Sequence, residues 1–188
     1  MEEKLVIWKG IADYNSVEHC LVTASTTDVT VSSTIVGTIN DLSFEVNYSL
    51  LLDGGWNAKE VYIEYVVDGT PHSWHYVKVS VGWLGGDSPE PVHCDCVDVD
   101  ITMTPFTNSL PINRLNLQPG QSAEIEVLYF DIPTEKVSTD VQKYTCIDEH
   151  TYRFENDGGN FTAELTIDSD GMITNYPGLF ERLYSYTQ

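Results

Sequence analysis

The fold is constrained most by an alternation of apolar and polar residues that recurs along almost the whole chain. Its clearest instance is a row in which every second residue is apolar, namely Leu42, Phe44, Val46, Tyr48 and Leu50. The residues between them are polar: Ser43, Glu45, Asn47 and Ser49. A period of two places successive side chains on opposite faces of a β-strand, whereas an amphipathic helix repeats every 3.6 residues. The pattern therefore predicts strands with one buried face.

Four further segments show the same alternation and are predicted to be strands. Their apolar rows are Val77, Val79, Val81, Trp83; Val97, Val99, Ile101, Met103; Ala123, Ile125, Val127, Tyr129; and Phe161, Ala163, Leu165, Ile167. The polar residues between them, including Lys78, Asp98 and Asp100, are expected to face away from these rows. Turn sequences such as Asp53-Gly54-Gly55 separate the strand candidates, as is usual in hairpins. We therefore predict an all-β, antiparallel fold.

Two segments depart from the strand pattern. Residues 104–121 contain Pro105, Pro111 and Pro119, and each proline removes a donor from a sheet ladder. This segment is predicted to be an ordered connection rather than a central strand. Residues 177–184 carry apolar side chains spaced at three and four, which predicts a short helical turn.

The chain has 188 residues, enough to bury a core, and residues 1–188 are predicted to form a single domain. No apolar run approaches the roughly 18 residues of a membrane-spanning helix, so the protein is not expected to be embedded in a membrane. The N-terminal segment has Glu2 and Glu3 where a secretory signal is basic. We therefore expect a cytoplasmic location.

The charge is strongly lopsided, with 29 acidic and 9 basic residues and a net charge of −20. Such a surface repels phosphate backbones, and basic patches interleaved with aromatic residues are missing from the sequence. Nucleic acid is therefore not an expected partner. Solvation of the outward strand faces is favoured as the reason for the acidity, over an acidic surface that binds cations or a basic partner.

The four cysteines are Cys20, Cys94, Cys96 and Cys146. Because a reducing compartment keeps thiols reduced, all four are expected to be free. Residues 93–100 contain six potential metal ligands, but the second pair of ligands that structural zinc sites use is missing from the sequence. The turn at Asp168 lacks the calcium-loop spacing, since its twelfth position is Leu179. We expect neither a metal nor a cofactor.

One stretch is too distinctive to be a generic strand and loop. Residues 98–115 read Asp-Val-Asp-Ile-Thr-Met-Thr-Pro-Phe-Thr-Asn-Ser-Leu-Pro-Ile-Asn-Arg-Leu. Together with Gln142, Tyr144, Asp170, Gly171 and residues 176–180, this stretch resembles the Putative glycolipid-binding family, formerly classed as a domain of unknown function. The resemblance spans about residues 8–182 and is densest in the second half.

The chain departs from the family pattern at two places. Asp95 stands where the family has Gly before the cysteine, and Ala58-Lys59 stands where many members have a Thr-Arg pair. A polar contact inferred for the family at that pair is therefore not carried over to this chain.

The resemblance implies a long sheet rolled into a spiral β-roll or incomplete barrel, likened to lipid carriers. It implies the non-enzymatic binding of a lipid or glycolipid-like ligand in an apolar concave cavity. The candidate ligand-binding residues are Trp56, Trp83, Phe106, Asn108, Arg114, Tyr144 and Tyr176.

Each of these residues also has an ordinary structural interpretation. The aromatic rings would equally suit a β-sheet core. Arg114 is favoured as an ion-pair partner of Asp98 or Asp100, with contact to a ligand head group as the alternative. The amide of Asn108 either orders the loop backbone or binds a glycan hydroxyl.

Two other functions remain open from the sequence. One is a small hydrolase of lipid or sugar conjugates that uses acid groups near Asp98 and Asp100. No Gly-x-Ser-x-Gly motif occurs, and His72 and His75 carry no further sign of catalysis. The other is a protein-interaction module that adds a partner strand to an open sheet edge.

Overall fold

The strands pair in an order that places the two ends of the chain side by side at the middle of one sheet. The computed structural model describes residues 2–11, 14–86 and 88–188. Its strands follow the order β8-β7-β6-β5-β4-β3-β2-β1-β15-β14-β13-β12-β11-β10-β9. The first and last strands pair with each other, and the two edge strands, β8 and β9, are consecutive in the chain.

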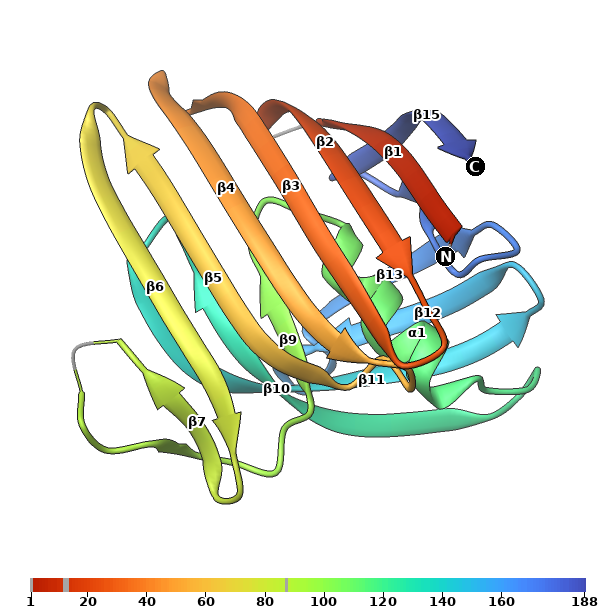
Figure 1. The fold of residues 1–188 in the computed structure, drawn as a ribbon. Coiled ribbons are helices and arrows are strands. Elements are labelled where there is room, and N and C mark those ends of the chain that lie inside the picture. Colours follow the sequence, from red (N-terminus) through yellow and green to blue (C-terminus); the bar gives the residue numbers. More distant parts are fainter. Residues whose placement is uncertain (1, 12–13, 87) are drawn as a thin grey trace.

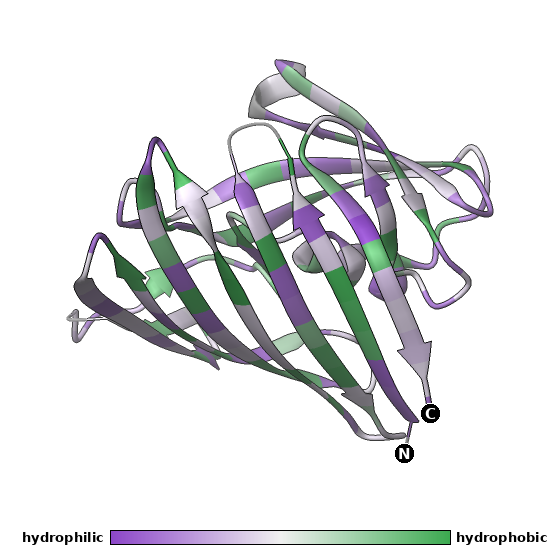
Figure 2. Cartoon of the chain, turned by 90° about the horizontal axis from the view of Figure 1, so that it is seen from above, coloured by the Kyte–Doolittle hydropathy of each residue, from purple (hydrophilic) through white to green (hydrophobic). Residues whose placement is uncertain are grey.

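The first half of the sheet is an up-and-down meander (Figure 1). Its strands are β1 (Glu2–Gly10), β2 (Asn15–Ala24), β3 (Asp28–Ile39), β4 (Leu42–Asp53), β5 (Ala58–Val67), β6 (Thr70–Val79), β7 (Gly82–Gly85) and β8 (Val92–His93). Figure 2 shows hydrophobic and hydrophilic residues alternating along these strands. The row predicted in β4 is confirmed, because Phe44, Val46, Tyr48 and Leu50 are buried, although Leu42 at the hairpin end is exposed.

The second half contains the remaining strands and three short helical segments. They are β9 (Asp98–Ile101), η1 (Phe106–Asn108), α1 (Ser109–Leu115), β10 (Ser122–Asp131), β11 (Lys136–Asp148), β12 (Thr151–Asn156), η2 (Asp157–Gly159), β13 (Phe161–Ile167), β14 (Ile173–Tyr176) and β15 (Phe180–Thr187). Only the pairing of β9 with β10 is parallel among the described strands. The predicted all-β, antiparallel class is therefore confirmed.

The sheet rolls so that its two halves face each other with α1 between them (Figure 1). It does not close, since β8 and β9 do not pair. Aromatic rings fill the space between the halves. The ring centroid of Phe130 in β10 lies 5.4 Å from that of Tyr76 and 5.8 Å from that of Trp74, both in β6. Trp8 of β1 donates from its indole to the carbonyl of Ile173, at 2.8 Å. Within the described ranges, the structure has no helix of the length and hydropathy needed to cross a membrane.

The prediction of one apolar row from Val77 to Trp83 is wrong. The chain turns after Val79, so β6 and β7 form a hairpin in which Lys78 lies opposite Trp83. Val77 and Val81 are exposed, whereas Trp83 is fully buried. Because of this turn, the buried face falls on odd-numbered residues in β7 but on even-numbered residues in β6. The sequence carries no glycine pair at residues 80–81 to mark the turn.

The alternation in β9 places Asp98 and Asp100 on the face opposite Val99 and Ile101, as predicted, but this face is not left to solvent. The polar face of β9 is covered by η1 and α1, which supply partners for both carboxylates. Arg114 of α1 pairs with Asp98, and Thr107 donates to Asp100 at 2.7 Å. Burial of this face is therefore accompanied by hydrogen bonding.

Two further predictions concern the segments that depart from the strand pattern. Residues 104–121 are the ordered connection that was predicted, and they also contain η1 and α1. The helical turn predicted over residues 177–184 is wrong, because β15 begins at Phe180 and pairs with β1.

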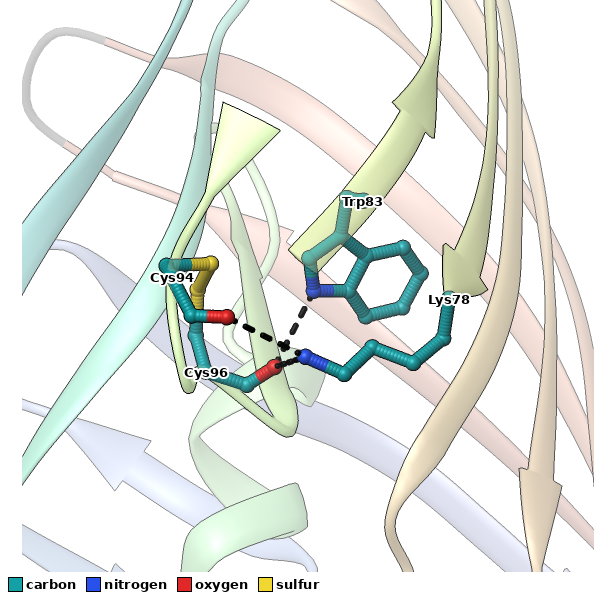
Figure 3. Close-up of a disulfide and its surroundings, with 4 residues drawn as sticks. All are labelled: Lys78, Trp83, Cys94 and Cys96. Atoms are coloured by element: carbon teal, nitrogen blue, oxygen red, sulfur yellow. Dashed lines mark hydrogen bonds between the residues drawn. A yellow bond between two sulfur atoms is a disulfide. The ribbon is translucent and has the colours of Figure 1, made fainter. Parts of the chain in front are cut away.

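The cysteine prediction is half wrong. Cys20 and Cys146 are free and buried, but Cys94 and Cys96 form a disulfide with Cα atoms 5.3 Å apart (Figure 3). Residues 94–97 belong to no strand, so the chain can turn there and bring the two sulfur atoms together.

Candidate ligand-binding site

A pocket of about 170 Å³ lies between the turn that follows β9 and the ends of strands β12 to β15. Its polar lining includes Asp100, Thr104, Asn108 and Asn156. Its aromatic lining consists of Tyr14, Tyr129, Phe154, Phe161, Tyr176 and Phe180. These residues come from segments far apart in the chain, which the rolled sheet brings to one place.

The turn after β9 forms one wall of the pocket and has an unusual backbone. Met103 has a φ of 75°, in the left-handed region that side chains other than glycine rarely adopt. Hydrogen bonds hold the residues on either side: Thr102 accepts from the backbone of Ile132 at 3.0 Å, and Thr104 accepts from the backbone of Phe106 at 3.0 Å. Strained backbone that is fixed by its surroundings is typical of ligand sites.

The polar wall is pre-oriented by hydrogen bonds from residues behind it. The Asp100 carboxylate accepts from Thr107 Oγ1 and from Gln142 Nε2, both at 2.7 Å. The Tyr144 hydroxyl donates to Asn108 Oδ1 at 2.9 Å. Burial raises the pKa of the Asp100 carboxyl, although the hydrogen bonds from Thr107 and Gln142 oppose this shift.

Asn156, on the aromatic side of the pocket, has an acceptor without a donor. Its Oδ1 atom is buried and receives no hydrogen bond from any residue in the described part of the chain. Buried polar atoms are nearly always hydrogen-bonded in folded proteins. An unpaired acceptor in the wall of a pocket is therefore suited to a donor that arrives with a ligand.

The aromatic wall is a continuous group of rings. The ring centroid of Tyr176 lies 6.3 Å from those of Phe154 and Phe161 and 6.1 Å from that of Phe180. Tyr14 stacks on Phe180 with centroids 5.8 Å apart. Burial, helped by the charge of Asp100, raises the pKa of the Tyr129 and Tyr176 phenols, which keeps both hydroxyls protonated as donors.

A buried glutamate lies one hydrogen bond behind the pocket. Glu18 Oε1 accepts from Thr104 at 2.9 Å and from Ser33 and Tyr48 at 2.7 Å. Its Oε2 atom has no partner among the described residues. Burial raises the pKa of the Glu18 carboxyl to about 7, although the hydrogen bonds from Tyr48, Ser33 and Thr104 lower it.

A family model described as "Putative glycolipid-binding" matches residues 5–182. The chain belongs to this family. The chain is also similar to a DUF1089 family protein from Pseudomonas aeruginosa whose crystal structure is known. The two sequences are 32% identical, and the structures superpose with a TM-score of 0.78 over 88% of this chain and 92% of that chain. Among curated proteins, none matches the sequence.

Several of the residues that carried the resemblance in the sequence lie at the pocket. The segment that begins at Asp98 supplies its strained turn and its polar wall, and residues 176–180 supply part of its aromatic wall. Gln142 and Tyr144 stand behind the polar wall and orient Asp100 and Asn108. Asp170 and Gly171, which also carried the resemblance, line other pockets.

The seven candidate residues from the sequence occupy different places. Asn108 and Tyr176 line the pocket, and Tyr144 orients Asn108. Phe106 and Trp83 are fully buried in the core. The remaining two, Arg114 and Trp56, do not line this pocket.

Arg114 forms the predicted ion pair, with Asp98 as its partner. Trp56 is partly buried and lines a separate pocket with Lys4, Asp170 and Met172. The lining residues that the sequence did not single out, such as Asn156 and Phe161, are common residue types in ordinary strand positions. Glu18 carried a usable signal, because it is acidic but alternates in phase with Cys20 and Val22.

Proposed function

We propose that this protein is a non-enzymatic binding protein that holds the sugar part of a glycolipid-like small molecule in the pocket of about 170 Å³. The observation that carries the proposal is the pairing of two walls. One wall presents aromatic rings, and the other presents the fixed polar groups of Asp100 and Asn108. Sugars have apolar ring faces and hydroxyl edges, so they are recognised by stacking and hydrogen bonding together.

The pocket size favours a head group over an acyl chain. Sites for drug-sized molecules have volumes of roughly 300–1,000 Å³, and this pocket has about 170 Å³. The concave interior of the roll is occupied by buried side chains, including Trp8, Trp83, Phe106 and Phe130. A lipid tail therefore stays outside the pocket, next to Phe161, whose side chain is 38% exposed.

The lining favours binding over glycoside cleavage. Most glycosidases flank the scissile bond with two carboxyl groups, and Asp100 is the one carboxylate among the described residues of the lining. Both oxygens of Asp100 already accept hydrogen bonds, from Thr107 and Gln142, so this carboxylate is held in place as part of the polar wall.

The sheet edges favour small-molecule binding over strand addition. The edge strands β8 and β9 have two and four residues. Short edge strands are one way in which proteins discourage pairing with another chain.

Native mass spectrometry of protein purified without detergent, followed by organic extraction, tests the proposal. We expect a retained adduct that yields a sugar-bearing lipid on extraction. A ligand-free mass that persists after incubation with added glycolipids would overturn it.

A further inference from the structure

The disulfide lies at the seam of the roll, in the link between the two edge strands. Residues 94–97 join β8 to β9, and the backbone NH of Ala58 in β5 donates to the carbonyl of Val97 at 2.8 Å. Cys96 is buried, and Cys94 is partly buried. The pair thus occupies a fixed piece of chain rather than a loose loop.

A third ligand group is brought to this pair by β10. The parallel register aligns Val127 with Asp98, which places Glu126 next to the residue that follows Cys96. The sulfur atoms of Cys94 and Cys96 and a carboxylate oxygen of Glu126 all lie within 4.8 Å of one another. The sequence could not pair Glu126 with the cysteines, because they are about 30 residues apart and meet only through this register.

Lys78 and Trp83 hold the link from the other side (Figure 3). Lys78 Nζ donates to the carbonyls of Cys96, at 2.6 Å, and Cys94, at 3.5 Å. The Trp83 indole donates to the Cys96 carbonyl at 3.1 Å. The ammonium group therefore lies against the backbone of the two cysteines, and a nearby positive charge stabilises thiolates.

We propose that Cys94, Cys96 and Glu126 form a redox-gated site for a divalent cation of the zinc class. In the oxidised protein both sulfur atoms are in the disulfide, and no thiolate is available to bind a metal. A dithiol reductant transfers two electrons and two protons to the sulfur–sulfur bond and becomes a cyclic disulfide itself. The cation then displaces the two thiol protons as the sulfur atoms bind it.

The geometry and charge of the reduced site suit Zn²⁺. Zinc–sulfur bonds of about 2.3 Å in tetrahedral geometry separate two sulfur ligands by about 3.8 Å. Cα atoms that are 5.3 Å apart permit this separation by side-chain rotation. Two thiolates and one carboxylate carry three negative charges, which Lys78 and a divalent cation together neutralise. Three protein ligands leave the fourth position to water.

Cobalt titration compares the two redox forms of the wild-type protein without any substitution. Co²⁺ replaces Zn²⁺ and gives a thiolate-to-cobalt absorption band. We expect one equivalent of Co²⁺ to bind with this band after reduction by a phosphine, and no band in the oxidised protein. A reduced protein without the band, or equal binding by both forms, would overturn the proposal.

Variants assign the ligands. We expect the band to vanish in Cys94→Ser/Cys96→Ser, in which Cys20 and Cys146 remain, and Glu126→Gln to weaken binding by roughly ten-fold or more. Glu124→Gln is the matched control, since Glu124 lies two residues away on the same exposed face of β10. Retention of the band in the double variant, or equal affinity in the two glutamine variants, would contradict the three-ligand site.

Discussion

The guanidinium group of Arg114 in α1 forms a hydrogen-bonded ion pair with the carboxylate of Asp98 in β9. Arg114 Nε donates to Oδ1 at 3.0 Å and to Oδ2 at 3.1 Å, and a second guanidinium nitrogen also donates to Oδ2. Asp98 is 1% exposed. The pair fixes the helix on the edge strand that carries the wall of the pocket.

Replacing Arg114 is expected to destabilise the protein strongly. Arg114→Met leaves the Asp98 carboxylate buried without a partner, which costs about 3–5 kcal/mol. Urea unfolding measures this loss. Arg153→Met is the matched control, because Arg153 and Glu164 form an exposed pair at 3.6 Å and such pairs contribute at most about 1 kcal/mol. Equal losses of unfolding free energy in the two variants would contradict a larger contribution from the buried Arg114–Asp98 pair.

Removing the ring of Phe161 is expected to weaken ligand binding with little effect on folding. Phe161 lines the pocket but is 38% exposed. A stacking contact contributes about 0.5–1.5 kcal/mol, so Phe161→Ala is expected to lower affinity by roughly two- to ten-fold. Calorimetric titration with a glycolipid measures the change. Tyr186→Ala removes an exposed ring of β15 outside the pocket lining and is expected to bind like the wild type; an equal loss there would count against the site.

Stability is expected to fall as the pH rises through neutrality because of Glu18. Its pKa is raised from 4.5 to about 7 in the folded protein, so the folded state binds this proton more tightly than the unfolded state. The stabilisation is complete below the unfolded pKa and is lost as the pH rises through the folded pKa, by about 3 kcal/mol in total.

Glu18→Gln removes this titration. Unfolding free energies measured between about pH 5 and pH 8 should therefore decline less in the variant than in the wild type. Glu124→Gln, at an exposed position, should keep the wild-type decline. If the unfolding free energies of the wild type and Glu18→Gln declined equally with pH, Glu18 would not be the group that causes the decline.

The alternation predicted the strand class well, because local periodicity reports which face of a strand is buried. It was correct for residues 44–50 and failed for the row from Val77 to Trp83, because the hairpin turn after Val79 changes the phase of the alternation. The alternation placed Asp98 and Asp100 on the correct face of β9 but did not show that this face is covered, because the covering residues come from α1, η1 and β11. The pocket depended on the same long-range packing, since Asn156 and Phe161 meet Asp100 only in the rolled sheet.

Recognition of a sugar by the pocket can be tested at Asn156. Its side-chain oxygen accepts no hydrogen bond from the described residues, so Asn156→Ala removes an acceptor that is available to a ligand. Loss of one hydrogen bond of about 1 kcal/mol lowers affinity roughly five-fold. Asn175→Ala is the matched control, because Asn175 is exposed next to Tyr176.

The measurement is calorimetric titration of the wild type and both variants with octyl glucoside, octyl galactoside and octyl mannoside, and with octanol. We expect saturable binding of at least one glycoside to the wild type, weaker binding to Asn156→Ala, unchanged binding to Asn175→Ala, and no comparable binding of octanol. Octanol binding as tight as that of the glycosides, or an Asn156→Ala variant that binds like the wild type, would contradict recognition of a sugar by the pocket.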